Sequence, residues 1–172
     1  MLKSIFAISF IVLLVSCTEE VEEKPREVNW TKQDSYDLGR NIAENEEIKI
    51  KLFLEMHKDW DLTITGTGLR YYVYEKGTGP APERGQTAKI EYVVSLLDGT
   101  ECYKTEADEY EEFLVDRSDV ETGVQEAIKL LKVGDHAKLI IPSHIGHGLL
   151  GDSNKIPPLT TLVVDLYLMG IK

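Results

Sequence analysis

The stretch V-E-T-G-V-Q-E-A-I-K-L-L-K-V-G-D-H-A-K-L-I-I-P, residues 120–142, carries two apolar periodicities in succession. Its first half has apolar residues at helical spacing, and Ser118 with Glu121 forms a predicted capping box ahead of them. We expect this helix to end at Gly134, since glycine suits the left-handed position after a helix. Residues 136–141 then alternate between polar and apolar side chains, which predicts a half-buried strand.

Strand patterns surround this stretch on both sides. Residues 69–76, 111–115 and 161–172 are predicted strands. Residues 86–97 form another, with Ala88, Ile90, Tyr92 and Val94 on one face. Asp98-Gly99 then predicts a hairpin. Since strands and helices do not alternate as in βαβ units, the sequence predicts an α+β fold: a twisted antiparallel β-sheet wrapped around one short amphipathic helix, preceded by an N-terminal helical segment.

The N-terminal helical segment is predicted within residues 30–64, because apolar residues recur at helical spacing through residues 30–60. A break near Asn45 is one option that the pattern leaves open. The simpler interpretation is a helix that packs on the domain or forms a stalk. The alternative is a dimerisation helix, and hence a homodimer through residues 30–60.

The first seventeen residues have the pattern of an export signal. A short positive start precedes a mostly apolar run, residues 4–15, that is too short to span a bilayer permanently. Leu14-Val15-Ser16-Cys17 resembles the bacterial lipobox, which implies a signal peptide over residues 1–16 and a lipidated Cys17. An ordinary secretory signal that ends near a cysteine is the alternative. Residues 17–29 would then be an acidic tether, and several acyl chains on Cys17 would anchor the protein stably to a membrane.

Composition limits the partners and the compartment. The formal net charge of -11 argues against nucleic acid, because phosphate binding needs clustered Lys and Arg. The chain has two cysteines, so a lipid on Cys17 leaves Cys102 without a disulfide partner. We expect a lipid-anchored protein of the bacterial cell envelope, at the outer rather than the inner membrane, on either its periplasmic or its surface side.

The order of the motifs resembles an FK506-binding-protein (FKBP)-type peptidyl-prolyl isomerase over residues 65–172. The resemblance rests on R-G-Q-T-A-K-I-E-Y (84–92), L-x-D-G-T (96–100), the opening stretch, and H-G-L-L-G-D-S-N-K-I-P-P (147–158). The lipobox, the charged helix and P-S-H-x-x-x-G-x-x-G-D also resemble the gliding-motility-associated lipoproteins of this family. The resemblance implies a catalyst of Xaa-Pro isomerisation in exported, proline-containing polypeptides. The barrier, roughly 18–20 kcal/mol, reflects lost amide resonance, so no nucleophile, metal or cofactor is required.

The family's pocket can be transferred onto this chain residue by residue. The resemblance implies catalytic positions at Tyr92, His147 and Ile156. It implies substrate-pocket positions at Cys102, Tyr103, Phe113, Val120, Glu121, Val124, Ile145 and Val164. Several depart from the family pattern: Cys102 and Tyr103 replace a phenylalanine and an aspartate, Glu121 an isoleucine, Val124 the tryptophan floor, His147 a loop tyrosine, and Val164 an aromatic. A catalytically inactive binding module or chaperone with the same fold is therefore the alternative function.

Two minor alternatives concern the loop that follows residue 142. His144, His147 and Asp152 would form a metal site only if Asp152 folded back, and Gly146 and Gly148 favour a loop instead. Cys102 beside His147 would have the geometry of an activated thiol. A small buried cysteine that fills a reduced pocket is the interpretation we prefer.

Overall fold

The computed structural model describes residues 29–117 and 120–172, and Lys32–Lys172 form one compact unit. Outside the described residues lie the predicted signal peptide, Cys17, most of the tether, and Ser118 of the predicted capping box. The elements are α1 (Lys32–Glu55), β1 (Thr63–Ile64), β2 (Arg70–Glu75), β3 (Thr87–Leu96), β4 (Glu101–Lys104), β5 (Glu111–Leu114), α2 (Thr122–Ile128), β6 (His136–Ile141), η1 (Ser143–Ile145) and β7 (Leu162–Ile171). In this part of the chain, no helix combines the length and the apolar character needed to cross a membrane.

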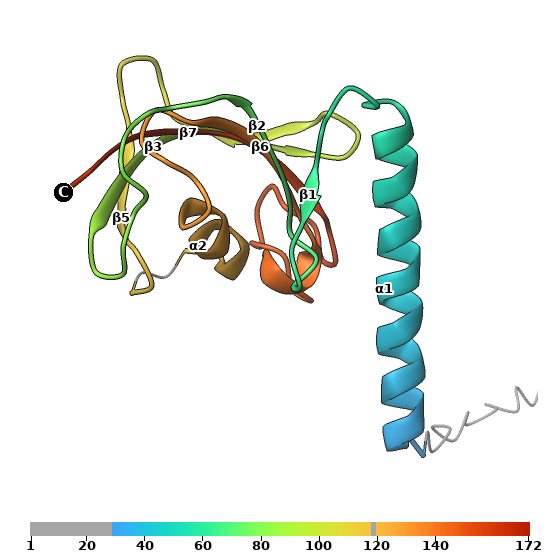
Figure 1. Ribbon diagram of the computed structural model, residues 1–172. Coiled ribbons are helices and arrows are strands. Elements are labelled where there is room, and N and C mark those ends of the chain that lie inside the picture. Colours follow the sequence, from blue (N-terminus) through green and yellow to red (C-terminus); the bar gives the residue numbers. More distant parts are fainter. Residues whose placement is uncertain (1–28, 118–119) are drawn as a thin grey trace, which may run out of the picture. The chain divides into compact units, whose positions relative to one another are not determined.

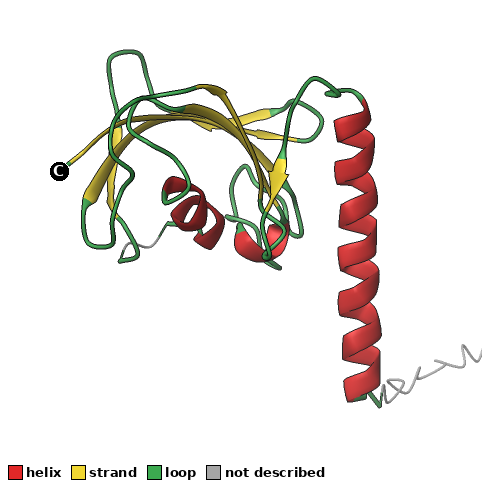
Figure 2. Ribbon diagram, in the orientation of Figure 1, coloured by secondary structure: helices red, strands yellow, loops and turns green. Residues whose placement is uncertain are grey.

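Within the described residues, seven strands belong to one antiparallel sheet, which confirms the predicted fold class. The strand order is β1-β2-β6-β7-β3-β4, and β5 pairs with β3 outside this path. Strands β3 and β7 are the longest, and they pair along nearly their whole length from Ala88–Ile171 to Leu96–Leu162. Figures 1 and 2 show that the sheet is strongly curved and that α2 lies against its concave face.

Close approach of α2 to the sheet depends on a glycine. A Cβ atom on Gly123 would lie 2.5 Å from Cγ2 of Ile141 and 3.1 Å from the carbonyl oxygen of Ile145. Ala127 and Ile128 on the same helix are almost completely buried in the main core. The missing side chain at Gly123 thus lets a seven-residue helix pack directly against β6 and η1.

The hairpin predicted at Asp98-Gly99 is confirmed between β3 and β4. Gly99 has a φ of 86°, and the Asp98 carboxylate accepts a hydrogen bond of 2.9 Å from the amide of Thr100. The amide of Leu96 donates to the carbonyl of Thr100 at 2.9 Å and closes the turn. The turn therefore sets the antiparallel register that brings Tyr103 opposite Val94.

The predicted end of the second helix is wrong. α2 ends at Ile128, six residues before Gly134, although Leu131 is still fully buried. Gly134 does have a left-handed φ of 97°, but it belongs to the turn before β6 and contacts Gly77. The helical apolar pattern continued beyond the helix because the following turn also buries its apolar residues against the core.

The N-terminal helix α1 is confirmed as one continuous element of 24 residues, without a break near Asn45. The apolar pattern predicted its face toward the domain only in part. Phe53, which belongs to the pattern, is buried against Ile140 together with Ile50, which does not belong to it. Three other apolar residues of the pattern are exposed: Ile48, Leu52 and Met56. The homodimer through residues 30–60 stays a prediction.

Candidate functional site

A cavity of about 400 Å³ opens between the concave face of the sheet, the start of α2 and the loop that joins β6 to β7. Its floor is apolar and consists of Ile90, Val94, Val120, Val124, Ile141, Ile156, Leu162, Val164 and Leu166. Its rim is polar and consists of Tyr92, Tyr103, Glu121, His147, Asp152 and Asn154. An apolar floor with a few converging polar groups is typical of a binding site for a small, mostly apolar group.

Strand alternation places most of this lining. Ile90, Tyr92 and Val94 are two residues apart on β3, so their side chains share one face of the sheet. The same rule brings Leu162, Val164 and Leu166 of β7 to the cavity. Because β3 and β7 are paired neighbours, these two rows lie side by side and form a continuous apolar floor.

Tyr92 forms one side of the rim. Its hydroxyl donates a hydrogen bond of 2.7 Å to Oε1 of Glu111 on β5. Burial, together with this hydrogen bond to a carboxylate, raises the pKa of the Tyr92 phenol well above its usual value. Tyr92 therefore stays a neutral phenol at every physiological pH, with its ring available as a wall of the cavity.

His147 and Glu121 meet across the mouth of the cavity. Nε2 of His147 lies 2.9 Å from Oε1 of Glu121, and the two side chains are 25 % and 28 % exposed. Glu121 precedes the first residue of α2, and His147 lies in the loop between β6 and β7. The pair joins the start of α2 to the loop between β6 and β7, and it gives Nε2 of His147 a partner within the chain.

Asp152 organises the far side of the rim. Its Oδ1 accepts hydrogen bonds from the amides of Asn154 (2.9 Å) and Ile156 (2.8 Å), and its Oδ2 accepts one from the hydroxyl of Tyr103. The hydrogen bond from Tyr103 is the main reason that the pKa of this carboxyl is lowered to about 2. A charged carboxylate thus holds the apolar side chain of Ile156 and the ring of Tyr103 in place around the cavity.

The residues of the metal hypothesis have separate partners. His144 Nε2 lies 2.9 Å from the carbonyl of Thr67, whereas His147 pairs with Glu121 and Asp152 with Tyr103. Within residues 29–117 and 120–172, no three His, Cys, Asp or Glu side chains gather as metal ligands. These contacts offer no support for metal binding in this loop.

Comparisons with known proteins give this architecture a family. Residues 79–169 match the family described as FKBP-type peptidyl-prolyl cis-trans isomerase, which is more than half of the chain. This chain belongs to the FKBP family. It is 32 % identical over 135 residues to the FKBP-type peptidyl-prolyl cis-trans isomerase FkpA of Escherichia coli strain K12, covering 78 % of this chain and 49 % of the relative.

Two further similarities extend this result. The chain is 30 % identical over 132 residues to the "Outer membrane protein MIP" of Legionella longbeachae, covering 76 % of this chain and 56 % of that protein. The crystal structure of FkpA from Escherichia coli superposes with a TM-score of 0.66 at 31 % identity, covering 81 % of this chain and 64 % of that one. The chain spans about half the length of the curated relatives it matches.

The FKBP cavity of this chain brings together eight of the eleven residues assigned from the sequence. These eight are Tyr92, Tyr103, Val120, Glu121, Val124, His147, Ile156 and Val164. The other three, Cys102, Phe113 and Ile145, are buried in the core and do not line the cavity, so their assignment to the substrate pocket needs correction. Tyr103 is one of the two aromatic residues that line the cavity, together with Tyr92.

Cys102 lies at an irregularity of the β3–β4 pairing, between Tyr103, which is opposite Val94, and Glu101, which is opposite Ser95. Its Sγ is buried 3.7 Å from the carbonyl oxygen of Lys155, in the loop between β6 and β7, and does not line the FKBP cavity. Cys102 is 2 % exposed, and burial raises the pKa of its thiol. A buried thiol with a raised pKa is a poor nucleophile, which favours the packing interpretation over an activated thiol.

Seven lining residues had no pocket role assigned from the sequence, and Asp152 and Asn154 are the polar ones among them. Asp152 was considered only as a third metal ligand. The signal that could have found it is the D-S-N turn, in which an aspartate accepts a hydrogen bond from the amide two residues later. Such a turn next to Ile156-Pro157-Pro158 stabilises the loop that carries a pocket residue.

Proposed function

We propose that this chain is a peptidyl-prolyl cis-trans isomerase that acts on Xaa-Pro bonds of exported polypeptides. The observation that carries this proposal is the cavity, which combines an apolar floor, a rim of hydrogen-bonding groups and a location in an FKBP-family domain. Its volume of about 400 Å³ is within the range of small-molecule sites. The family relatives named above as isomerases support the same activity.

Catalysis of this isomerisation requires a site that excludes water and binds the twisted amide of the transition state. The proline ring would lie on the apolar floor near Val124, Val164 and Ile156, away from water. In the transition state the carbonyl no longer conjugates with the nitrogen. Binding of this twisted amide is favoured by desolvation and by hydrogen-bond donors that point at the carbonyl oxygen. No bond is broken and no proton is transferred permanently, which agrees with a lining that consists mostly of aliphatic side chains.

Two donors on the rim can serve the substrate carbonyl. Nε2 of His147 becomes available when a substrate displaces the carboxylate of Glu121, which now lies 2.9 Å from it. The amide of Glu121 is the second donor, because a backbone N–H is present whatever side chain the residue carries. Tyr92 contributes the wall against which the substrate packs.

The test is the rate of cis-trans exchange in an Xaa-Pro peptide, measured by NMR exchange spectroscopy. We expect Tyr92→Ala to lower kcat/KM about tenfold, because it removes an aromatic wall of the cavity. We expect His147→Ala to lower kcat/KM about threefold to tenfold through loss of a hydrogen-bond donor. Tyr74→Ala is the matched control, since Tyr74 is exposed and does not line the cavity.

A folded chain without any rate above the uncatalysed exchange would contradict isomerase activity and favour the inactive binding module. If the chain is active but both Tyr92→Ala and His147→Ala leave the rate unchanged, the cavity is not the active site. An equal loss in Tyr74→Ala would point to a general effect on the fold.

We also propose that Cys17 anchors the protein to the envelope of a bacterial cell. The Leu14–Cys17 order and the similarity to a relative named "Outer membrane protein MIP" support this location. Cys17→Ala is expected to move the chain from the membrane fraction to the soluble fraction, because the lipid can no longer be attached. A variant that stays with the membrane would contradict lipid anchoring at Cys17. The gliding-motility subfamily stays a prediction from the sequence.

A further inference from the structure

The pocket loop, residues 142–161, begins and ends beside one another. It carries His147, Asp152 and Ile156 of the cavity, and the strands that flank it are joined where Ile141 pairs with Leu162. Ser143 at its start and Thr161 at its end are almost completely buried, with 3 % and 4 % exposure. The two ends of the loop are therefore held inside the structure, whereas its cavity residues lie between them.

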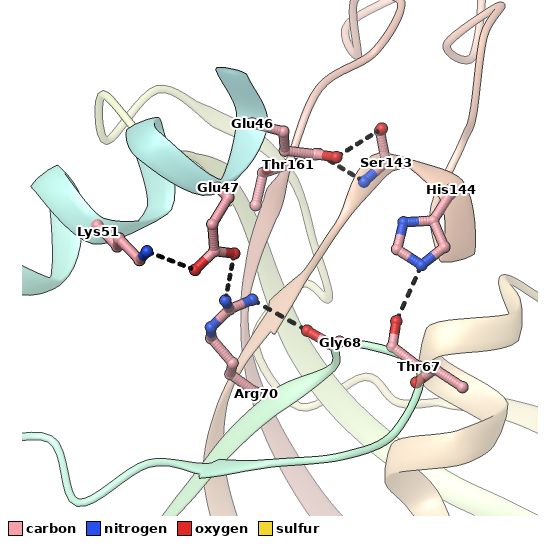
Figure 3. Close-up of polar contacts among 9 residues, drawn as sticks. All are labelled: Glu46, Glu47, Lys51, Thr67, Gly68, Arg70, Ser143, His144 and Thr161. Carbon is pink, nitrogen blue, oxygen red and sulfur yellow. Dashed lines mark hydrogen bonds and ion pairs between the residues drawn. The ribbon is translucent and has the colours of Figure 1, made fainter. Parts of the chain in front are cut away.

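One carboxylate from α1 binds both ends of this loop. Oε1 of Glu46 accepts hydrogen bonds from the amide of Ser143 (2.7 Å) and from the hydroxyl of Thr161 (2.6 Å). Oε2 accepts a third from the hydroxyl of Ser143 at 3.0 Å. Figure 3 shows Glu46 reaching from α1 to Ser143 and Thr161. Hydrogen bonds to a charged acceptor are stronger than neutral ones, so this bridge is a firm link.

The bridge at Ser143 extends to the backbone on both sides of His147. The carbonyl of Ser143 accepts hydrogen bonds from the amides of Gly146 (3.1 Å) and Gly148 (2.8 Å). The carbonyl of Gly148 in turn accepts from the amide of Leu159 at 2.9 Å, which joins the two arms of the loop. Movement of Ser143 would thus be transmitted directly to the residues next to His147.

Separate contacts fix α1 in the place from which Glu46 acts. Glu47 forms an ion pair of 2.5 Å with Arg70, whose side chain is buried and also donates to the carbonyl of Gly68 at 3.0 Å. Figure 3 shows the contacts of Arg70 with Glu47 and Gly68 next to those of Glu46. One turn farther along α1, Ile50 and Phe53 pack against Ile140. The helix is therefore attached to the domain by groups other than Glu46.

We propose that Glu46 is a positioning residue for the substrate cavity, which makes α1 a working part of the isomerase site. By tying the two ends of the pocket loop together, Glu46 holds His147 and Ile156 in the arrangement that binds substrate. A loop that is ordered before binding loses less conformational entropy when the substrate arrives. This inference rests on the proposed function only for its kinetic consequence; the effect on the loop itself is independent of it.

The experiment compares the full chain with Glu46→Ala and with Glu47→Gln, which loses the neighbouring ion pair but no contact with the loop. Amide hydrogen exchange is measured across the domain. We expect Gly146, Gly148 and Leu159 to exchange about tenfold faster in Glu46→Ala, because the ends of the loop are released. We expect no such change in Glu47→Gln. Thr161→Val, which removes one of the three hydrogen bonds, should give a smaller change of the same kind. This variant tests the proposal if Glu46→Ala does not fold.

The kinetic readout separates positioning from general stability. We expect Glu46→Ala to raise KM about threefold to tenfold while kcat stays within about twofold, because the loop must now be ordered by the substrate. Unchanged exchange in the loop of Glu46→Ala and Thr161→Val would overturn the proposal, as would equal loosening in Glu47→Gln. A wild-type chain without isomerase activity would contradict the proposed function, and the exchange data would still decide the role of Glu46.

Discussion

Gly151→Ala is expected to destabilise the chain by about 3 kcal/mol and to lower kcat/KM for an Xaa-Pro peptide at least about tenfold. Gly151 has a φ of 66°, and a Cβ atom there would lie 2.2 Å from the carbonyl oxygen of Ile156 and 2.8 Å from the carbonyl carbon of Pro157. Those atoms belong to the backbone and cannot rotate away. The loop must shift, and Ile156 must leave its place in the cavity wall.

Gly85→Ala is the matched control for this substitution. Gly85 has a comparable left-handed φ of 86°, but its Cβ would have nothing within 4 Å, and it does not line the cavity. We expect a loss of only about 1 kcal/mol, from the backbone conformation alone, with kcat/KM unchanged. Chemical denaturation and peptide exchange measure both quantities. Equal effects in the two variants would show that the close contact at Gly151 does not matter.

The sheet could be predicted from the sequence because the pattern that makes it is local. Alternation along β3 correctly placed Ile90, Tyr92 and Val94 on one face, and the structure places all three in the cavity. The Asp98-Gly99 turn likewise carries its own conformational preference, so it could be assigned without knowing its partners. Features of this kind need only neighbouring residues.

The orientation of α1 could not be predicted in the same way. Its contact face includes Glu46 and Glu47. These side chains attach α1 to the domain only through their partners Ser143, Thr161 and Arg70, which are far away in the sequence. A search for apolar periodicity treats two adjacent glutamates as solvent-facing. It therefore selected a face that the structure leaves partly exposed.

The residues that line the cavity were predicted better on the strands than on the loops. Transfer of family positions placed both Cys102 and Tyr103 in the pocket, but only Tyr103 lines it, because Cys102 lies at an irregularity of the β3–β4 pairing and is buried in the core. The role of Asp152 depends on a loop that folds back so that one carboxylate meets the amides of Asn154 and Ile156. The conformation of such a loop depends on the tertiary structure, and no periodicity in the sequence predicts it.

Asp152→Ala is expected to lower kcat/KM about tenfold or more, because it removes the acceptor that Tyr103 and two loop amides share. Asp152→Asn is the matched variant, since its carbonyl oxygen can still accept from the amides of Asn154 and Ile156. We expect it to retain most of the activity. Exchange rates of an Xaa-Pro peptide measure both variants, and equal losses would mean that charge, rather than the hydrogen bonds, is what the loop requires.

The charge of Asp152 also predicts a dependence on pH. Its pKa is lowered from 3.8 to about 2 in the folded chain, so between these values the unfolded chain binds more protons than the folded one. The stabilisation by this carboxylate is therefore complete above about pH 4 and is lost as the pH falls toward 2. The free energies of unfolding of the wild type and of Asp152→Asn should differ by a constant amount above pH 4 and converge below it. Because the other carboxyls are shared by both proteins, a difference that stays the same between pH 4 and pH 2 would show that Asp152 lacks these partners in solution.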